Sequence, residues 1–191
     1  MNIRILGLCH VLVGGAAVVL SVIVTGGIPL GGGINTWPFT IGLGYVVLGT
    51  AALWRERTWD VQSGMFVTAM ALGTSWGVRT LTELLNSDFL YLTSNLADST
   101  VSVFLIAPVF FALPFGIARA EGARRASWFL AAVSIGMFGV GYAFWGEGLR
   151  HVGDPLWAGF LAVVIVVVGL PTLPPIYFGR YLSGETALLN H

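Results

Sequence analysis

Residues 5–27 read ILGLCHVLVGGAAVVLSVIVTGG, an apolar run without a single charged side chain. A helix needs about 20 consecutive apolar residues to cross the hydrocarbon core of a bilayer. The apolar part of a cleaved signal peptide is shorter, at roughly 7–15 residues, and precedes a cleavage site. Because VTGGIPL at residues 24–30 is a poor cleavage site, we predict that residues 5–27 form a retained transmembrane helix.

The rest of the chain has the same apolar character. Of its 191 residues, 56% are hydrophobic and 9% are charged, and the mean hydropathy is +0.85. Soluble domains carry about 25% charged residues, so this much apolar surface indicates a lipid bilayer as the solvent. Backbone groups in lipid must be paired within a helix or a closed barrel. No period-two alternation typical of a barrel is visible, so each apolar run is predicted to be a helix.

We therefore expect an all-α, polytopic transmembrane helix bundle, a single domain over residues 1–191 in the cell membrane. Six spans are predicted near residues 5–27, 37–54, 62–84, 97–118, 126–146 and 155–178. Most basic residues then fall on one side of the membrane, namely Arg4, Arg55, Arg57, Arg119, Arg124, Arg125 and Arg180. Since positively charged loops stay inside the cell, both termini are predicted to be cytoplasmic. Tryptophans near the predicted ends would form an interfacial belt: Trp37, Trp54, Trp59, Trp128, Trp145 and Trp157.

The third span is the most polar, and its polar residues lie at helical spacing. Thr68, Ser75, Arg79, Thr82 and Glu83 fall roughly on one face. Hydroxyl and small residues allow helices to approach and to hydrogen-bond across a bundle, so this face is predicted to point inward. Arg79 would lie about five residues, or ~7 Å, from the outer end. It can snorkel to the headgroups and pair with Glu83, or it can form the floor of an outward-facing polar vestibule.

The fifth connection adds charged residues on the same predicted outer side. The candidate ligand-binding residues are Ser75, Arg79, Thr82, Glu83, Glu147, Arg150 and His151. We expect no metal there, because Gly148 and Gly153 disfavour the continuous helix that would present His151 and Glu147 together. His10 and His151 are predicted on opposite sides, so no haem or other cofactor is expected, and His10 is predicted to be a hydrogen-bonded interior residue.

Glycines inside the spans predict close helix crossings: Gly14, Gly15, Gly42, Gly44, Gly49, Gly136, Gly139 and Gly141. The same faces could bind other membrane subunits or a second copy of the chain. The segment LPTLPPIYFGRYL, residues 170–182, is interpreted as the exit of the last span near residue 178.

Three classes of function remain open at this point. The leading hypothesis is a protein that binds or transports a small solute through the outer polar vestibule. The alternative is a structural or accessory subunit of a membrane complex. A membrane enzyme comes third, because no catalytic signature such as H-E-x-x-H or G-x-S-x-G occurs. The net charge of zero argues against nucleic acid as a partner.

Overall fold

The computed structural model describes residues 3–28, 36–54, 58–86, 92–144 and 153–183. Within these ranges the chain is all-helical, with no strand, which confirms the all-α part of the predicted fold. The helices are α1 (Ile3–Thr25), α2 (Trp37–Trp54), α3 (Val61–Asn86), α4 (Leu92–Ala120), α5 (Arg124–Phe144) and α6 (Pro155–Leu182).

Five of the six helices are long and apolar enough to cross a membrane: α1, α2, Thr100–Ala120 of α4, α5 and α6. Large apolar side chains cover the outside of the bundle, for example Val24 and Leu156, each 83% exposed. Such a surface is compatible with a membrane-embedded protein. The exception, α3, has 26 residues but carries the polar residues that face its neighbours.

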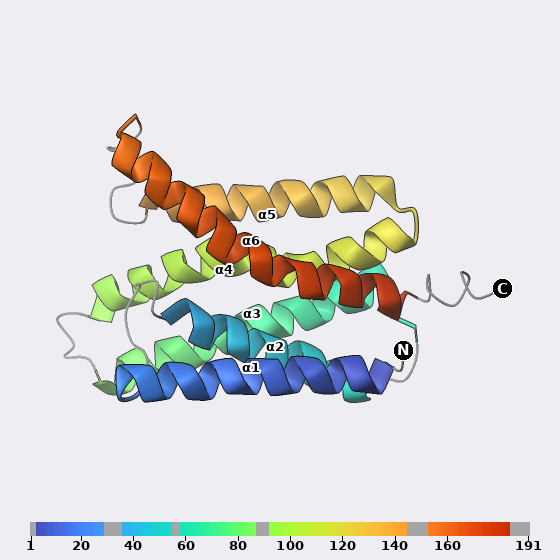
Figure 1. The fold of residues 1–191 in the computed structure, drawn as a ribbon, viewed down its shortest axis with the longest axis horizontal. Helices are drawn as coiled ribbons and strands as arrows, with labels where there is room; N and C mark the ends of the chain where they lie inside the picture. The colour runs from blue at the N-terminus through green and yellow to red at the C-terminus, as the bar shows by residue number, and fades with distance from the viewer. Residues whose placement is uncertain (1–2, 29–35, 55–57, 87–91, 145–152, 184–191) are drawn as a thin grey trace.

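The helices run side by side along the long axis of the molecule, and α6 crosses α4 obliquely (Figure 1). Helix α4 is central and packs against α2, α3, α5 and α6, whereas α1 packs mainly on α2, and α5 mainly on α4. The N-terminus, the α4–α5 turn and the end of α6 lie together at one end (Figure 1). We call it the arginine-rich end, because its described residues include Arg4, Arg119, Arg124, Arg125 and Arg180.

Helices α1 and α2 meet through two pairs of glycines. A Cβ atom on Gly14 would lie 2.5 Å from the carbonyl oxygen of Gly42, and one on Gly42 would lie 2.7 Å from that of Gly14. Gly7, seven residues before Gly14, and Gly49, seven residues after Gly42, repeat this arrangement. Backbones this close leave no room for any side chain, so the predicted close crossing is confirmed here.

Helix α6 continues through Pro171, Pro174 and Pro175 to Leu182, beyond the exit predicted near residue 178. Pro175 has no N–H, so the carbonyl of Pro171 loses its usual donor four residues later. The hydroxyl of Tyr45 on α2 donates to that carbonyl instead. Freed carbonyls are tolerated in lipid when a neighbouring helix supplies a donor, and this allows the helix to continue.

In helix α4, a hydrogen bond from a neighbouring helix compensates for Pro114 in the same way. This proline leaves the carbonyl of Phe110 without its helical donor. The Thr68 hydroxyl on α3 donates to the Phe110 carbonyl oxygen at 3.0 Å, and the bond is buried. A hydroxyl from a neighbouring helix thus compensates for one proline in each of α4 and α6, the two described helices with prolines in their interior.

Among the tryptophans of the predicted belt, two are exposed, two are buried and Trp157 is half-buried. Trp54 and Trp128 are 92% and 72% exposed near helix ends, as an interfacial belt requires. Trp37 and Trp59 are buried in the core, so the predicted belt is wrong for these two. They lie where α2 and α3 begin to pack against the bundle, and the backbone N–H of Trp59 donates to the Leu182 carbonyl at 3.0 Å. Trp145 lies outside the described residues.

Candidate functional site

The polar face of α3 points into the bundle, as predicted. Thr68, Ser75, Arg79 and Thr82 are all buried, whereas Phe66 and Leu81 on the other side of the same helix are exposed. The polar side chains therefore serve contacts between helices, and the apolar ones face the surroundings.

The hydroxyls of this face are used within the chain. Ser75 donates to the Thr40 carbonyl on α2 at 3.1 Å, and Thr40 donates to the Thr36 carbonyl at 2.9 Å. Thr82 donates to the Val78 carbonyl one turn back, at 2.7 Å. Each hydroxyl proton is thus committed to a backbone carbonyl, and the Ser75 bond joins α3 to the beginning of α2.

Arg79 is enclosed by the bundle, with an exposed fraction of 1%. Its Nε and Nη1 atoms are both buried, so the side chain does not extend outward as a snorkelling arginine would. It lies seven residues before Asn86, the end of α3, which is roughly 10 Å of helix. The side chain of Glu83 lies outside the described part of the chain, so its pairing with Arg79 stays a prediction.

The other sequence candidates belong to the connection between α5 and α6. Glu147, Arg150 and His151 lie outside the described residues, so the structure does not bring them together with Arg79. Asp154, which follows them, is the N-cap of α6, and its carboxylate accepts the Leu156 N–H at 2.9 Å. An N-cap of this kind stabilises the start of a helix, which gives Asp154 a structural role.

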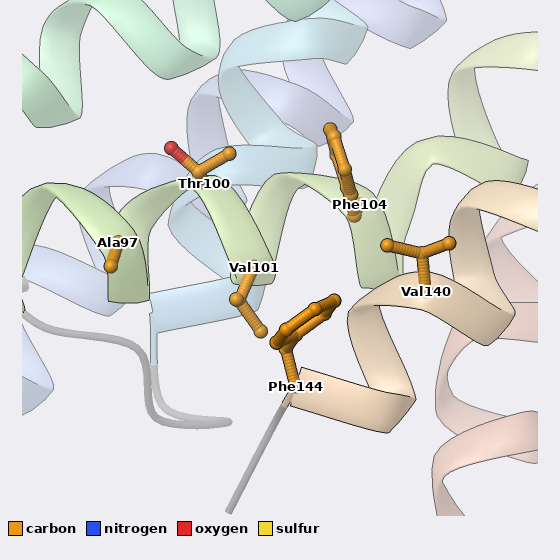
Figure 2. Close-up of a pocket in the computed structure, with 6 residues that line it drawn as sticks. All are labelled: Ala97, Thr100, Val101, Phe104, Val140 and Phe144. Atoms are coloured by element: carbon orange, nitrogen blue, oxygen red, sulfur yellow. The ribbon is translucent and has the colours of Figure 1, made fainter.

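A cavity of about 360 Å³ opens between α4 and α5. Figure 2 shows Thr100, Val101 and Phe104 of α4 beside Val140 and Phe144 of α5. Its walls are apolar apart from Thr100, whose Oγ1 accepts the Trp76 Nε1–H at 3.3 Å. The cavity is therefore suited to an apolar group.

A second apolar groove, of about 190 Å³, runs between α5 and α6 over Pro108 of α4. Ile135 and Phe138 form one wall, and Ile165 and Val168 form the other. Arg79 lines neither this groove nor the cavity between α4 and α5. The polar face of α3 and these hollows are thus separate features.

His10 links three helices at a buried position. Its Nδ1 is 2.9 Å from the Leu6 carbonyl oxygen, so Nδ1 carries the proton and donates. The ring stacks on Phe178 of α6, with centroids 4.3 Å apart, and lies 5.4 Å from the ring of Tyr45 on α2. The prediction of a hydrogen-bonded interior histidine is confirmed.

Helix α5 carries small residues on the side turned away from α4. Ala132, Gly136, Gly139 and Ala143 recur at intervals of four, three and four residues, which places them on one helix face. A Cβ atom on Gly136 or Gly139 would have nothing within 4 Å. We call these four residues the small-residue face of α5.

The sequence pattern treats Gly136, Gly139 and Gly141 alike, although they differ in the structure. Gly141 faces α4, where a Cβ atom would lie 2.9 Å from the Leu105 nitrogen. What distinguishes them is whether each glycine faces α4. The sequence alone does not show this, because it does not show which helix α5 contacts. The Tyr45 bond does have a sequence signal, since Pro171 and Pro175 are four residues apart.

No family model, no curated protein and no solved structure matches this chain. Its function must therefore be inferred from its own residues, from the enclosed polar face of α3 and the open small-residue face of α5.

Proposed function

We propose that the protein crosses the cell membrane six times, with both termini in the cytoplasm. Helix α3 packs against α2 and α4 within the bundle (Figure 1), and its polar side is buried. The arginine-rich end would be cytoplasmic by the positive-inside rule. An epitope tag on either terminus should be cleaved by protease only in inside-out vesicles, and cleavage on intact cells would contradict this topology.

We further propose that the protein is a structural or accessory subunit that associates with a transmembrane helix through the small-residue face of α5. The observation that carries this proposal is the open space at Gly136 and Gly139, on a helix that packs mainly against α4 alone. The polar stripe of α3 supports it indirectly. Its hydroxyls are committed within the chain and Arg79 is enclosed, so they favour packing over an open solute pathway.

Small residues favour helix association for a simple physical reason. In lipid there is no hydrophobic driving force between helices, so association depends on close packing and on weak Cα–H···O contacts between backbones. Gly136 and Gly139 allow such an approach. The exposed side chains of Ile135 and Val140 adjoin this face and would pack against the sides of an incoming helix.

Photo-crosslinking tests this association in native membranes. With a photoreactive amino acid at Val140, we expect a crosslinked adduct that is lost when Gly136 and Gly139 are both replaced by Leu. A Cβ atom at either glycine has no neighbour within 4 Å among the described residues, so the monomer should fold normally. Gly159→Leu on α6 is the matched control, since that glycine is also open and should leave the adduct intact. An adduct that survives the double substitution would contradict the proposal.

A second candidate function is solute binding at the polar face around Arg79. It is favoured by the enclosed guanidinium, because ionisable groups inside a membrane bundle are costly and usually functional. If it is correct, a solute in a thermal-shift screen should stabilise the detergent-purified protein, and Arg79→Gln should abolish that shift without preventing assembly. A shift that Arg79→Gln leaves unchanged would exclude Arg79 from the site.

A further inference from the structure

The turn between α4 and α5 forms a polar cavity, open on one side, at the arginine-rich end. It has a volume of about 230 Å³ and is lined by Ala118, Arg119, Gly122, Arg124 and Ser127. A single water needs only ~10–15 Å³ of such space, so the cavity can hold a multi-atom ligand. The two arginines come from opposite sides of the turn, one from the end of α4 and one from the start of α5.

Arg119 and Arg124 bring two positive charges to this cavity. Within the part of the chain that the structure describes, neither guanidinium has an ion pair or a hydrogen bond. Guanidinium groups bind phosphate oxygens through paired, charge-assisted hydrogen bonds. Two such groups lining one small cavity repel each other and are stabilised by a shared anion.

The backbone of the turn also favours a negatively charged ligand. The last carbonyls of α4 are occupied, since Ile117 accepts from Glu121 at 2.9 Å and Ala118 accepts from Ala123 at 2.9 Å. Gly122, with φ of 70°, makes this reversal possible. Helix α5 then begins at Arg124 with no acidic residue in its first turn, so the positive end of its dipole is left uncompensated. The partial negative charge of the last α4 carbonyls is thus neutralised by hydrogen bonds. The partial positive charge of the first α5 amides is not neutralised by any acidic side chain in that turn.

The acidic residue on this turn does not compensate the arginines. Glu121 is exposed and is not among the lining residues. Burial, and secondarily the negative charge of Asp60 before α3, raise the pKa of its carboxyl above the ordinary value. No carboxylate is among the residues that line the cavity.

We infer that the cavity lined by Arg119 and Arg124 binds a phosphate-bearing anion. This site is separate from the small-residue face of α5 and does not depend on it. The phosphate could belong to the headgroup of an anionic phospholipid or to a small phosphorylated solute. Basic pockets between helices at a cytoplasmic surface bind lipid headgroups, and the exposed Trp128, one turn after Arg124, would lie at that level.

Binding can be measured on the full chain purified in a neutral maltoside detergent. The probes are phosphatidylglycerol, phosphatidylcholine and inorganic phosphate, read by thermal shift and native mass spectrometry. We expect phosphatidylglycerol or inorganic phosphate to bind, and the double variant Arg119→Gln/Arg124→Gln to weaken that binding at least tenfold. If only phosphatidylglycerol binds, the source is a lipid headgroup. If inorganic phosphate binds as well and competes, the source is a soluble phosphate.

The matched control is Arg125→Gln, because Arg125 is exposed and adjacent but does not line the cavity. It should change binding less than threefold. An equal loss in Arg125→Gln and in the double variant would overturn the inference, as would failure of both anionic probes to bind the wild type. Because the substituted side chains are exposed, folding should persist. Arg119→Lys/Arg124→Lys, which keeps the charge but loses the paired hydrogen bonds, should give an intermediate affinity.

Discussion

Helix α5 and the α1–α2 pair both contain glycines within long apolar helices, but these glycines have opposite surroundings in the structure. In α1 and α2, Gly7, Gly14, Gly42 and Gly49 each face the backbone of the other helix. In α5, Gly136 and Gly139 face open space. A glycine pattern therefore shows where a close approach is possible, and only the arrangement of the helices shows whether the chain already contains the partner.

The difference arises from which face of each helix its main neighbour covers, since α1 packs mainly on α2 and α5 mainly on α4. Gly7 and Gly14 are seven residues apart and so lie on one face, which α2 covers completely. Helix α5 also turns one glycine, Gly141, toward its main neighbour α4. Within the described residues, no second neighbour of that kind covers the opposite face of α5, so Gly136 and Gly139 stay open.

The largest effect is expected for Gly14→Ile. The new side chain would collide with the Gly42 carbonyl, and backbone cannot give way as a side chain can. Overpacking of this kind costs about 3 kcal/mol, measurable as a loss of unfolding free energy in detergent. Gly15→Ile is the control, since Gly15 has nothing within 4 Å, and it should cost less than about 1 kcal/mol. Equal losses would break the distinction between closed and open glycines.

A smaller effect is expected for Tyr45→Phe, which leaves the Pro171 carbonyl without its donor. Interhelical hydrogen bonds in membranes contribute about 1 kcal/mol, so the unfolding free energy should fall by about that amount. Tyr142→Phe on α5 is the matched control, because no hydrogen bond of the Tyr142 hydroxyl occurs within the described residues. If both variants lose the same stability, the Tyr45 bond does not hold α2 to α6.

The smallest effect is electrostatic and lies at the turn that leads into α5. The pKa of Glu121 is raised in the folded protein by burial and by Asp60, so the folded state favours the protonated carboxyl. This contribution to stability is present below the ordinary value of 4.5 and is lost as the pH rises through the folded pKa. Glu121→Gln should therefore melt slightly above wild type at pH 7 and level with it at pH 4. A variant that melts below wild type at pH 7 would contradict this assignment.

The inward face of α3 and the interior position of His10 could be predicted from spacing and polarity. A single polar stripe on an apolar helix must be buried against its neighbours, whichever neighbours those are. The burial of Trp37 and Trp59 could not be predicted in the same way, because a tryptophan near a helix end suits both an interface and a core. The candidate site shows the same limit. The inward face of α3 could be predicted, but the sequence left open whether Arg79 snorkels outward or is enclosed, and the structure encloses it. The cavity at Arg119 and Arg124 depends on how one turn folds.

Hydropathy along the chain was sufficient to predict the all-helical fold. In lipid, a single apolar run can pair its backbone N–H and C=O groups only by forming a helix. That information is local, since each helix carries its own hydrogen bonds. Packing is not local. The contact of Gly14 with Gly42, the bond from Tyr45 to the Pro171 carbonyl and the open face of α5 each depend on which helix lies alongside. In lipid, apolar side chains provide no force that would select one neighbour over another, so these features emerge only from the fit of the assembled helices.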